Sequence, residues 1–246
     1  MNESEADVPI LSLKSVSRSF GALKVSDDVS FDVAPGEALG IIGPNGAGKS
    51  TLFNLIAGNL RPDAGTVLFE GVDVTHQSTM QRCVSGVGRS FQIPQPFGHL
   101  SVYENLLVAA QFGGGWRGRE AAGHCVDILG RTGLEDVSDK PAGGLSLLKR
   151  KRLELARAMA TSPRLILLDE IAGGLTEAEC GELIVTIKAI HASGTAIIWI
   201  EHVLHALNSV VERLMVLNFG KVLMIGEPGA VMASPEVREI YLGIEV

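Results

Sequence analysis

The sequence is poor in cysteine and in aromatic residues, which make up only 5% of the chain. Its three cysteines, Cys83, Cys125 and Cys180, are widely spaced and odd in number. Neither a disulfide framework nor a zinc-ligand spacing is therefore predicted, and a reducing compartment is expected. The chain also contains no internal repeat and no low-complexity tract. These absences exclude disulfide-stabilised secreted scaffolds and repeat proteins.

Long hydrophobic runs and an excess of positive charge are also missing. Apolar runs such as LILL and AIIWI are short, whereas a membrane-spanning helix needs about 20 apolar residues. The formal net charge is -7, which argues against a general nucleic-acid binder. The first ten residues are acidic and polar, so no signal peptide is expected. We expect a chain that spans no membrane by itself but is free to lie against a membrane protein.

Hydrophobic residues make up 46% of the 246 residues, which is ample for a buried core. Period-two patterns predict strands over much of residues 10–34, and the run ALGIIG predicts a buried strand. A helix is predicted from about Lys49 to Ala57. Up to about residue 75 the chain is therefore expected to be rich in strands, with one helix.

The rest of the sequence divides into a helical middle and an alternating end. Ser101 with Glu104, and Thr176 with Glu179, have the spacing of capping boxes that start helices. After residue 163, strand and helix patterns alternate. This alternation predicts an α/β fold with a parallel sheet. The helical middle is expected to be an insertion between the strands of that sheet.

A glycine-rich segment, GPNGAGKST, lies between a predicted strand and a predicted helix and matches the phosphate-binding P-loop pattern. Its glycines allow successive backbone N–H groups to point at one anion, and the helix that follows adds its positive end. Lys49 is expected to reach the β- and γ-phosphates, Ser50 to bind Mg²⁺, and Thr51 to bond the α-phosphate. The predicted ATP-binding residues of this loop are Gly43, Pro44, Asn45, Gly46, Ala47, Gly48, Lys49, Ser50 and Thr51.

The segment LILLDE places two carboxylates, Asp169 and Glu170, at the end of an apolar strand. An acidic strand end is common and is weak by itself. Together with a P-loop it predicts the Mg²⁺ side of a nucleotide site, where Asp169 holds the ion's ligand shell. Glu170 follows directly and is expected to polarise an attacking water as general base.

With these motifs in order, the sequence resembles the ATP-binding subunits of ABC transporters along nearly its whole length. It is most similar to those of branched-chain amino acid uptake systems, through SVYENLLVA and the C-terminal VLNFGKVLMIGEPGAVMASPEVREIYLG. The resemblance implies that Phe20 stacks on adenine and that Gln92 links Mg²⁺ and water to the transmembrane partner. It also implies that Glu170 is the catalytic glutamate, His202 the switch histidine, and Ser146 part of the signature segment that meets the opposing subunit's ATP.

The resemblance also implies an architecture. We expect a single ABC ATP-binding domain over residues 1–246, with a P-loop NTPase (RecA-like) parallel-sheet core, an N-terminal antiparallel β subdomain and an inserted α-helical subdomain. The catalytic lobe is expected at 8–92 and 158–246, and the helical subdomain at 93–157. This helical subdomain is expected to carry the groove that receives a cytoplasmic helix of a permease.

Cofactors, partners and location follow from the same resemblance. ATP and Mg²⁺ are the expected ligands, with Ser50, Gln92 and Asp169 on the metal. The partners are transmembrane permease subunits, a second ATP-binding subunit in a homo- or heterodimer, and indirectly a periplasmic or extracellular solute-binding protein; no nucleic acid is expected. The chain is expected to be peripheral, on the cytoplasmic face of the inner membrane.

The signature segment departs from the family pattern L-S-G-G-Q, because this chain reads LSLLK. Leu147 and Leu148 replace two glycines and are expected to crowd the approach to the opposing subunit's nucleotide. Lys149 replaces the glutamine and begins four consecutive cations, which are unfavourable in the first turn of a helix. One hypothesis places Lys149 near the ATP of the opposing subunit. The alternative is that most of the run is a solvated face, with Arg150 and Arg152 packing on the fold.

The same motifs are compatible with three functions. The first is an energising ATPase of an importer, driven by ATP-dependent dimer closure. The second is an ATP-binding dimerisation module with weak hydrolysis because of LSLLK, and the presence of both Glu170 and His202 argues against it. The third is a soluble ABC protein of repair or translation, but those proteins usually join two such domains. The transported solute does not follow from this sequence.

Overall fold

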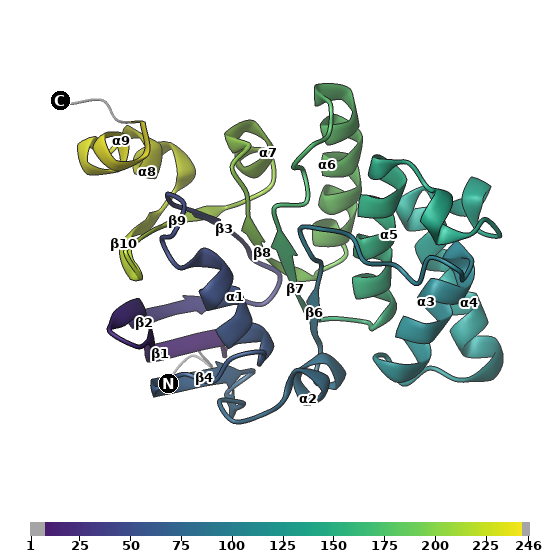
Figure 1. Cartoon of the computed structure of the whole chain (residues 1–246), viewed down its shortest axis with the longest axis horizontal. Helices are drawn as coiled ribbons and strands as arrows, with labels where there is room; N and C mark the ends of the chain where they lie inside the picture. The colour runs from purple at the N-terminus through teal and green to yellow at the C-terminus, as the bar shows by residue number, and fades with distance from the viewer. Residues whose placement is uncertain (1–7, 243–246) are drawn as a thin grey trace, which may run out of the picture.

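The computed structural model describes residues 8–242 and contains two β-sheets and a group of helices (Figure 1). Residues 1–7 and 243–246, which include most of the acidic N-terminal segment and both ends of the expected domain, lie outside the described residues. The strands are β1 Leu11–Phe20, β2 Leu23–Val33, β3 Ala38–Ile42, β4 Ala64–Phe69, β5 Val72–Asp73, β6 Val87–Arg89, β7 Leu165–Asp169, β8 Ala196–Ile200, β9 Arg213–Asn218 and β10 Lys221–Gly226. The α-helices are α1 Lys49–Ala57, α2 Thr79–Val84, α3 Val102–Phe112, α4 Gly118–Thr132, α5 Leu147–Ala160, α6 Glu177–Ala192, α7 Leu204–Asn208, α8 Pro228–Ala233 and α9 Pro235–Leu242, and two 3₁₀ turns are η1 Glu135–Val137 and η2 Ala142–Gly144.

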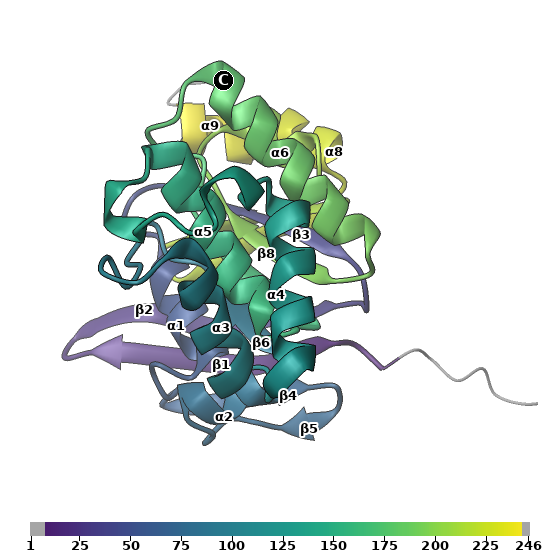
Figure 2. The ribbon, with the colours of Figure 1, turned by 90° about the vertical axis from the view of Figure 1, so that its right-hand side faces the viewer.

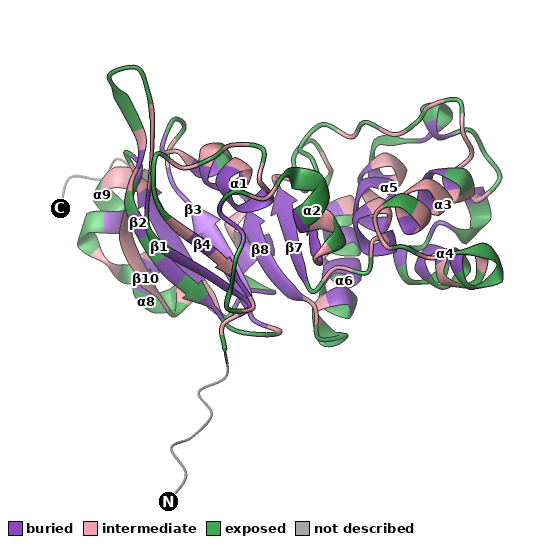
Figure 3. Cartoon of the chain, turned by 90° about the horizontal axis from the view of Figure 1, so that it is seen from below, coloured by how far each residue is buried: buried purple, intermediate pink, exposed green. Residues whose placement is uncertain are grey.

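The larger sheet has six strands in the order β10-β9-β3-β8-β7-β6. All neighbouring pairs are parallel except β9 with β10. The strands β3, β7 and β8 are buried over their whole length, as Figure 3 shows. The predicted α/β fold with a parallel core is confirmed. The carboxyl ends of β3, β7 and β8 meet at one edge, so the segments that follow them lie close together.

Two hydrophobic cores cover the two faces of this sheet, because side chains alternate along each strand. In β8, Ile198 and Ile200 point into a core shared with α1 and with the antiparallel sheet β2-β1-β4-β5. Ile197 and Trp199 point into the other core, which contains the buried faces of α3 to α6. The predicted N-terminal antiparallel β subdomain is therefore present, and α1 packs between it and the central sheet.

Helices α3, α4 and α5 contact one another and form the inserted helical part of the chain (Figure 2). The capping boxes predicted at Ser101/Glu104 and Thr176/Glu179 are confirmed. A third capping box, at Ser78 and Gln81, starts the short α2, which the sequence patterns did not predict. Helix α5 continues to Ala160, so the predicted helical subdomain, residues 93–157, ends inside this helix.

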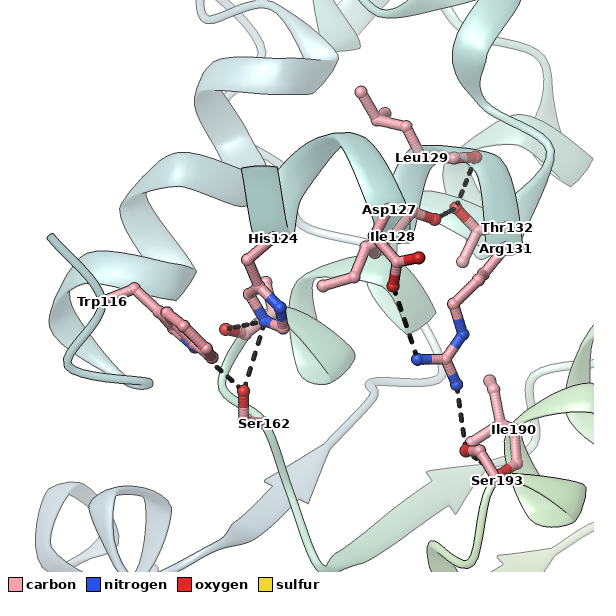
Figure 4. A network of polar contacts seen from close by, with 11 residues as sticks. Trp116, His124, Asp127, Ile128, Leu129, Arg131, Thr132, Ser162, Ile190 and Ser193 are labelled. Carbon is pink, nitrogen blue, oxygen red and sulfur yellow. Dashed lines mark hydrogen bonds and ion pairs between the residues drawn. The ribbon is translucent and has the colours of Figure 1, made fainter. Parts of the chain in front are cut away.

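A polar network joins α4 to the turn between α5 and β7 (Figure 4). Trp116 stacks on the His124 ring with 4.5 Å between ring centroids. The Trp116 indole N–H donates to the Ser162 hydroxyl at 2.9 Å, and His124 Nε2 lies 3.2 Å from both that hydroxyl and the Ala160 carbonyl oxygen. Arg131 donates to the Ser193 hydroxyl at the end of α6. These contacts fix the orientation of α4 relative to the strands β7 and β8.

Candidate active site

The predicted P-loop connects β3 to α1 and curls around an open cavity. Two glycines are required by close backbone approaches: a β-carbon on Gly43 would lie 2.1 Å from the Leu217 carbonyl oxygen, and one on Gly48, where φ is 101°, 2.3 Å from that of Val25. Gly48 also caps α1 without a side-chain acceptor, which leaves the first N–H groups of this helix available to an anion. The cavity is lined by Leu23, Val25, Asn45, Gly46, Ala47, Gly48, Lys49, Ser50, Thr51 and Glu170.

Lys49 lies across the base of this loop and is 6% exposed. Its ammonium donates to the carbonyl oxygens of Gly43 at 2.7 Å and Pro44 at 3.1 Å. Burial lowers the pKa of Lys49, and the nearby carboxylates of Glu170 and Asp169 oppose this shift. The lysine, the glycine backbone and the helix end therefore form a positively polarised cradle suited to phosphate.

Asp169 ends β7 and is 7% exposed. Arg89, at the end of the neighbouring β6, donates to its carboxylate at 3.1 Å and to the Asn54 side-chain oxygen of α1 at 2.7 Å. Burial raises the pKa of Asp169, and the hydrogen bond from Arg89 opposes the shift. The sequence patterns did not single out Arg89. The nearest sequence signal was its place three residues before Gln92.

The three predicted catalytic side chains meet at Glu170. Gln92 Nε2 donates to one carboxylate oxygen, Oε2, and His202 Nε2 lies 2.9 Å from the other, Oε1. Glu170 adopts a φ of 46°, a conformation that is unfavourable for a residue with a side chain. Its backbone N–H is held by the Ile200 carbonyl oxygen at 2.8 Å. Three segments that are far apart in the sequence thus place an amide, a carboxylate and an imidazole together beside the P-loop cavity.

Phe20, which the resemblance assigned to adenine stacking, ends β1 and is 48% exposed. The guanidinium carbon of Arg18 lies 5.1 Å from its ring centroid. The wall of the P-loop cavity on this side is formed by Leu23 and Val25 of β2, and Phe20 lies outside it.

The segment LSLLK forms the start of α5, where the Ser146 hydroxyl caps the helix by accepting the Lys149 backbone N–H. The expectation that both leucines crowd the approach needs correction. Leu147 is 43% exposed, but Leu148 is 8% exposed and packs in the core of the helical part. The position after the N-cap faces outward and the next one faces inward, because a helix turns by 100° per residue.

Lys149 forms an ion pair with Asp136 at 2.5 Å and lies 3.4 Å from the Gly133 carbonyl oxygen. Its ammonium is therefore directed toward η1 of its own chain. An exposed ion pair of this kind stabilises a fold by about 0–1 kcal/mol, so it opposes a move of Lys149 toward a partner only weakly. Contact between Lys149 and an opposing nucleotide remains a prediction.

Comparison with known proteins identifies the family. Residues 26–173 match the family model described as ABC transporter. The chain belongs to this family. This ABC protein is 34% identical over 252 residues to the high-affinity branched-chain amino acid transport ATP-binding protein LivG of Escherichia coli K12. The matched region covers 96% of this chain and 98% of that relative. It is also 34% identical over 234 residues to the lipopolysaccharide export system ATP-binding protein LptB of Acidithiobacillus ferridurans, across 95% and 97% of the two chains.

Similarity to solved structures supports the same family assignment. A nucleotide-free ATP-binding cassette from an ABC transporter superposes with a TM-score of 0.87 at 32% identity and covers 96% of this chain and 100% of that one. The protein is thus an ATP-binding subunit of an ABC transporter. It is an ATPase that uses ATP with Mg²⁺, dimerises and works with transmembrane permease subunits. Within residues 8–242, no helix is both long and apolar enough to cross a bilayer.

Proposed function

We propose that this ABC ATPase energises an importer of branched-chain or related amino acids, and that it lies on the cytoplasmic face of the inner membrane. The observation that carries the importer assignment is similarity to LivG along almost the whole chain. LptB relatives match equally well, so the solute must be tested directly. An external solute-binding protein would deliver the amino acid to the permease.

The geometry supports hydrolysis rather than nucleotide binding alone. Glu170 is proposed to accept the proton of the attacking water, and His202, which contacts Glu170 Oε1 at 2.9 Å, is proposed to orient that water and the γ-phosphate. Gln92 bonds the other carboxylate oxygen and so connects the base to the segment that leads into the helical part. A module that only binds ATP has no use for these three side chains in contact.

The polar residues around the cradle also fit a magnesium ion. Ser50 is exposed at the cavity, and Asp169 supplies a buried carboxylate behind it. Hydroxyl and carboxylate oxygens are the ligands that Mg²⁺ prefers. Ser50, Asp169 and Gln92 would hold the ion, which when bound neutralises charge on the β- and γ-phosphates. Lys49 supplies a further positive charge, and Phe20 is proposed to stack on the adenine.

An apolar groove between α2, α3 and α5 is proposed to receive a cytoplasmic helix of the permease. Its lining includes Met80 and Val84 of α2 and Phe112 of α3, which are 73%, 65% and 78% exposed. Apolar side chains gathered at such exposure mark an interaction surface. The sequence predicts this groove within residues 93–157. The groove proposed here is lined by residues of α2 as well. Arg89 and Phe91 line the adjoining pocket, so the proposed groove would lie next to the pairing of Arg89 with Asp169.

Two experiments test this proposal. In the organism that encodes the chain, deletion of the gene should abolish uptake of labelled leucine, isoleucine or valine, and the wild-type gene but not Glu170→Gln should restore it. Unchanged uptake of these amino acids, with loss of urea, amide or aromatic-acid uptake or of lipopolysaccharide export, would refute the proposed solute.

The second experiment measures ATP turnover per subunit, which should rise with the concentration of the purified chain if LSLLK supports a homodimeric site. A flat, negligible rate would point to a heteromeric partner or to a required permease.

A further inference from the structure

Lys151 is the third of the four consecutive cations and the only one of them that reaches the candidate active site. It is 4% exposed, and its ammonium donates to the Gln92 carbonyl oxygen at 2.8 Å. The same ammonium lies 3.4 Å from the carbonyl oxygen of Glu170. One side chain of α5 thus binds the backbones of two residues whose own side chains bond each other.

The surroundings of Lys151 combine burial with two nearby carboxylates. Burial lowers its pKa, and the carboxylates of Glu201 and then Glu170 oppose this shift. Glu201 is 1% exposed and accepts the backbone N–H of Ala172 at 3.0 Å and that of His202 at 2.9 Å. The buried carboxylate of Glu201 thus binds the loop after Glu170 and the backbone of His202. It balances the buried ammonium of Lys151, which binds the carbonyl groups of Gln92 and Glu170.

Helix α5 connects Lys151 to the signature segment. The helix is capped by Ser146, the residue proposed to meet the nucleotide of the opposing subunit, and Lys151 lies five residues after this cap on the same rigid element. A displacement of the start of α5 would move the ammonium and both carbonyl groups that it holds. A long, otherwise flexible side chain is fixed here by two acceptors.

We propose that Lys151 is a positioning residue that fastens the segment of Gln92 and the segment of Glu170 to the signature helix, so that contact with the opposing subunit sets the catalytic geometry. This inference rests on the proposed roles of Gln92, Glu170 and Ser146. It does not depend on which solute is transported.

The test is steady-state ATP hydrolysis by the full-length protein with Lys151→Met, which keeps the unbranched apolar stem of the side chain, one atom shorter, but removes its charge and donors. We expect kcat to fall by about 10- to 100-fold, because displacement of a reacting group by about 1 Å has effects of this order. The KM and the affinity for a fluorescent ATP analogue should remain within about twofold. Lys151→Arg retains the charge and two or more donors and should recover much of the lost kcat.

Arg152→Met is the matched control, because it removes a neighbouring charge of α5 whose partner is Glu182, at 2.9 Å and outside the site. It should leave kcat unchanged. If Lys151→Met fails to fold because Glu201 is left unbalanced, Lys151→Met/Glu201→Gln removes that charge and should restore a folded protein that still has low kcat.

Wild-type kcat in folded Lys151→Met, or in the double variant, would overturn the inference. So would a loss of ATP affinity as large as the loss of kcat, since that would indicate general damage. Glu170→Gln measured in parallel separates the two proposals. If Glu170→Gln retains full turnover, the proposed role of Glu170 fails whatever Lys151 does; if it abolishes turnover while Lys151→Met does not alter it, only the present inference fails.

Discussion

Replacing Leu148 by glycine, the residue that the family signature has at this position, is expected to destabilise the fold. Leu148 is 8% exposed and belongs to the core of the helical part, whereas its neighbour Leu147 is 43% exposed. Both residues lie in the first turn of α5, so the backbone penalty of glycine is similar at the two positions. Comparing Leu148→Gly with Leu147→Gly therefore isolates the contribution of side-chain burial.

The size of the difference follows from the exposed fractions. Truncation of a buried leucine lowers the free energy of unfolding by about 3 kcal/mol or more, including the cavity that it leaves. Truncation of a half-exposed leucine loses only about half of its transfer free energy, or about 1 kcal/mol. The expected difference of about 2 kcal/mol corresponds to about 4–8 °C in Tm for a chain of this size.

Thermal and urea unfolding of the two variants measure this difference. Leu148→Gly should melt several degrees below Leu147→Gly, and both should unfold in one transition if the helical part remains cooperative with the sheet. Equal Tm values, or a higher Tm for Leu148→Gly, would refute the packing described for α5. The expected result would also mean that the glycine pair of the family cannot be restored here without repacking the core.

Three further predictions concern other parts of the molecule. Lys49→Met should lower ATP affinity in isothermal titration calorimetry by about tenfold or more, because the cradle loses its buried cation; an unchanged affinity would refute the proposed phosphate site. Burial holds the pKa of His124 below its usual value, so the unfolded state binds more protons and stability should fall as the pH drops below about 6.5. His124→Phe should show a smaller loss of Tm between about pH 7 and pH 5, and an equal loss would contradict this. Val84→Glu should abolish permease-stimulated but not basal ATP hydrolysis, whereas Val185→Glu, equally exposed on α6, should affect neither; an intact stimulation in Val84→Glu would exclude the groove.

The elements predicted from the sequence are those whose signals are local. The P-loop, the helix from Lys49 to Ala57 and the capping boxes at Ser101 and Thr176 each depend on residues within a few positions of one another. The carboxylates at the end of β7 followed from the apolar run before them. Short elements were missed, because the three residues of β6 and the six of α2 are too few for a periodic pattern.

Contacts between distant segments could not be predicted in the same way. Arg89 and Asp169 are separated by 80 positions, and nothing near either residue indicates the other. Likewise, the Gln92 side chain meets Glu170 across 78 positions. Parallel strands bring such residues to one edge of the sheet, but which side chains pair depends on the order β8-β7-β6, which the pattern of helices and strands does not specify.

The four consecutive cations illustrate why a run of like charge in a sequence is not a patch in a structure. A helix rotates by 100° per residue, so these side chains point in four directions and find four different sets of acceptors. Lys149 pairs with Asp136, Arg150 donates to the Gly143 carbonyl oxygen, and Arg152 pairs with Glu182. Lys151 alone turns inward to the candidate site. Arg150 and Arg152 pack on the fold, as the alternative for this run has it, and Lys149 forms an exposed ion pair, whereas Lys151 is buried. The unfavourable charge at the start of α5 is offset by acceptors from three separate segments and by the carbonyl groups of Gln92 and Glu170. In this acidic protein each cation of the run thus makes a different contact.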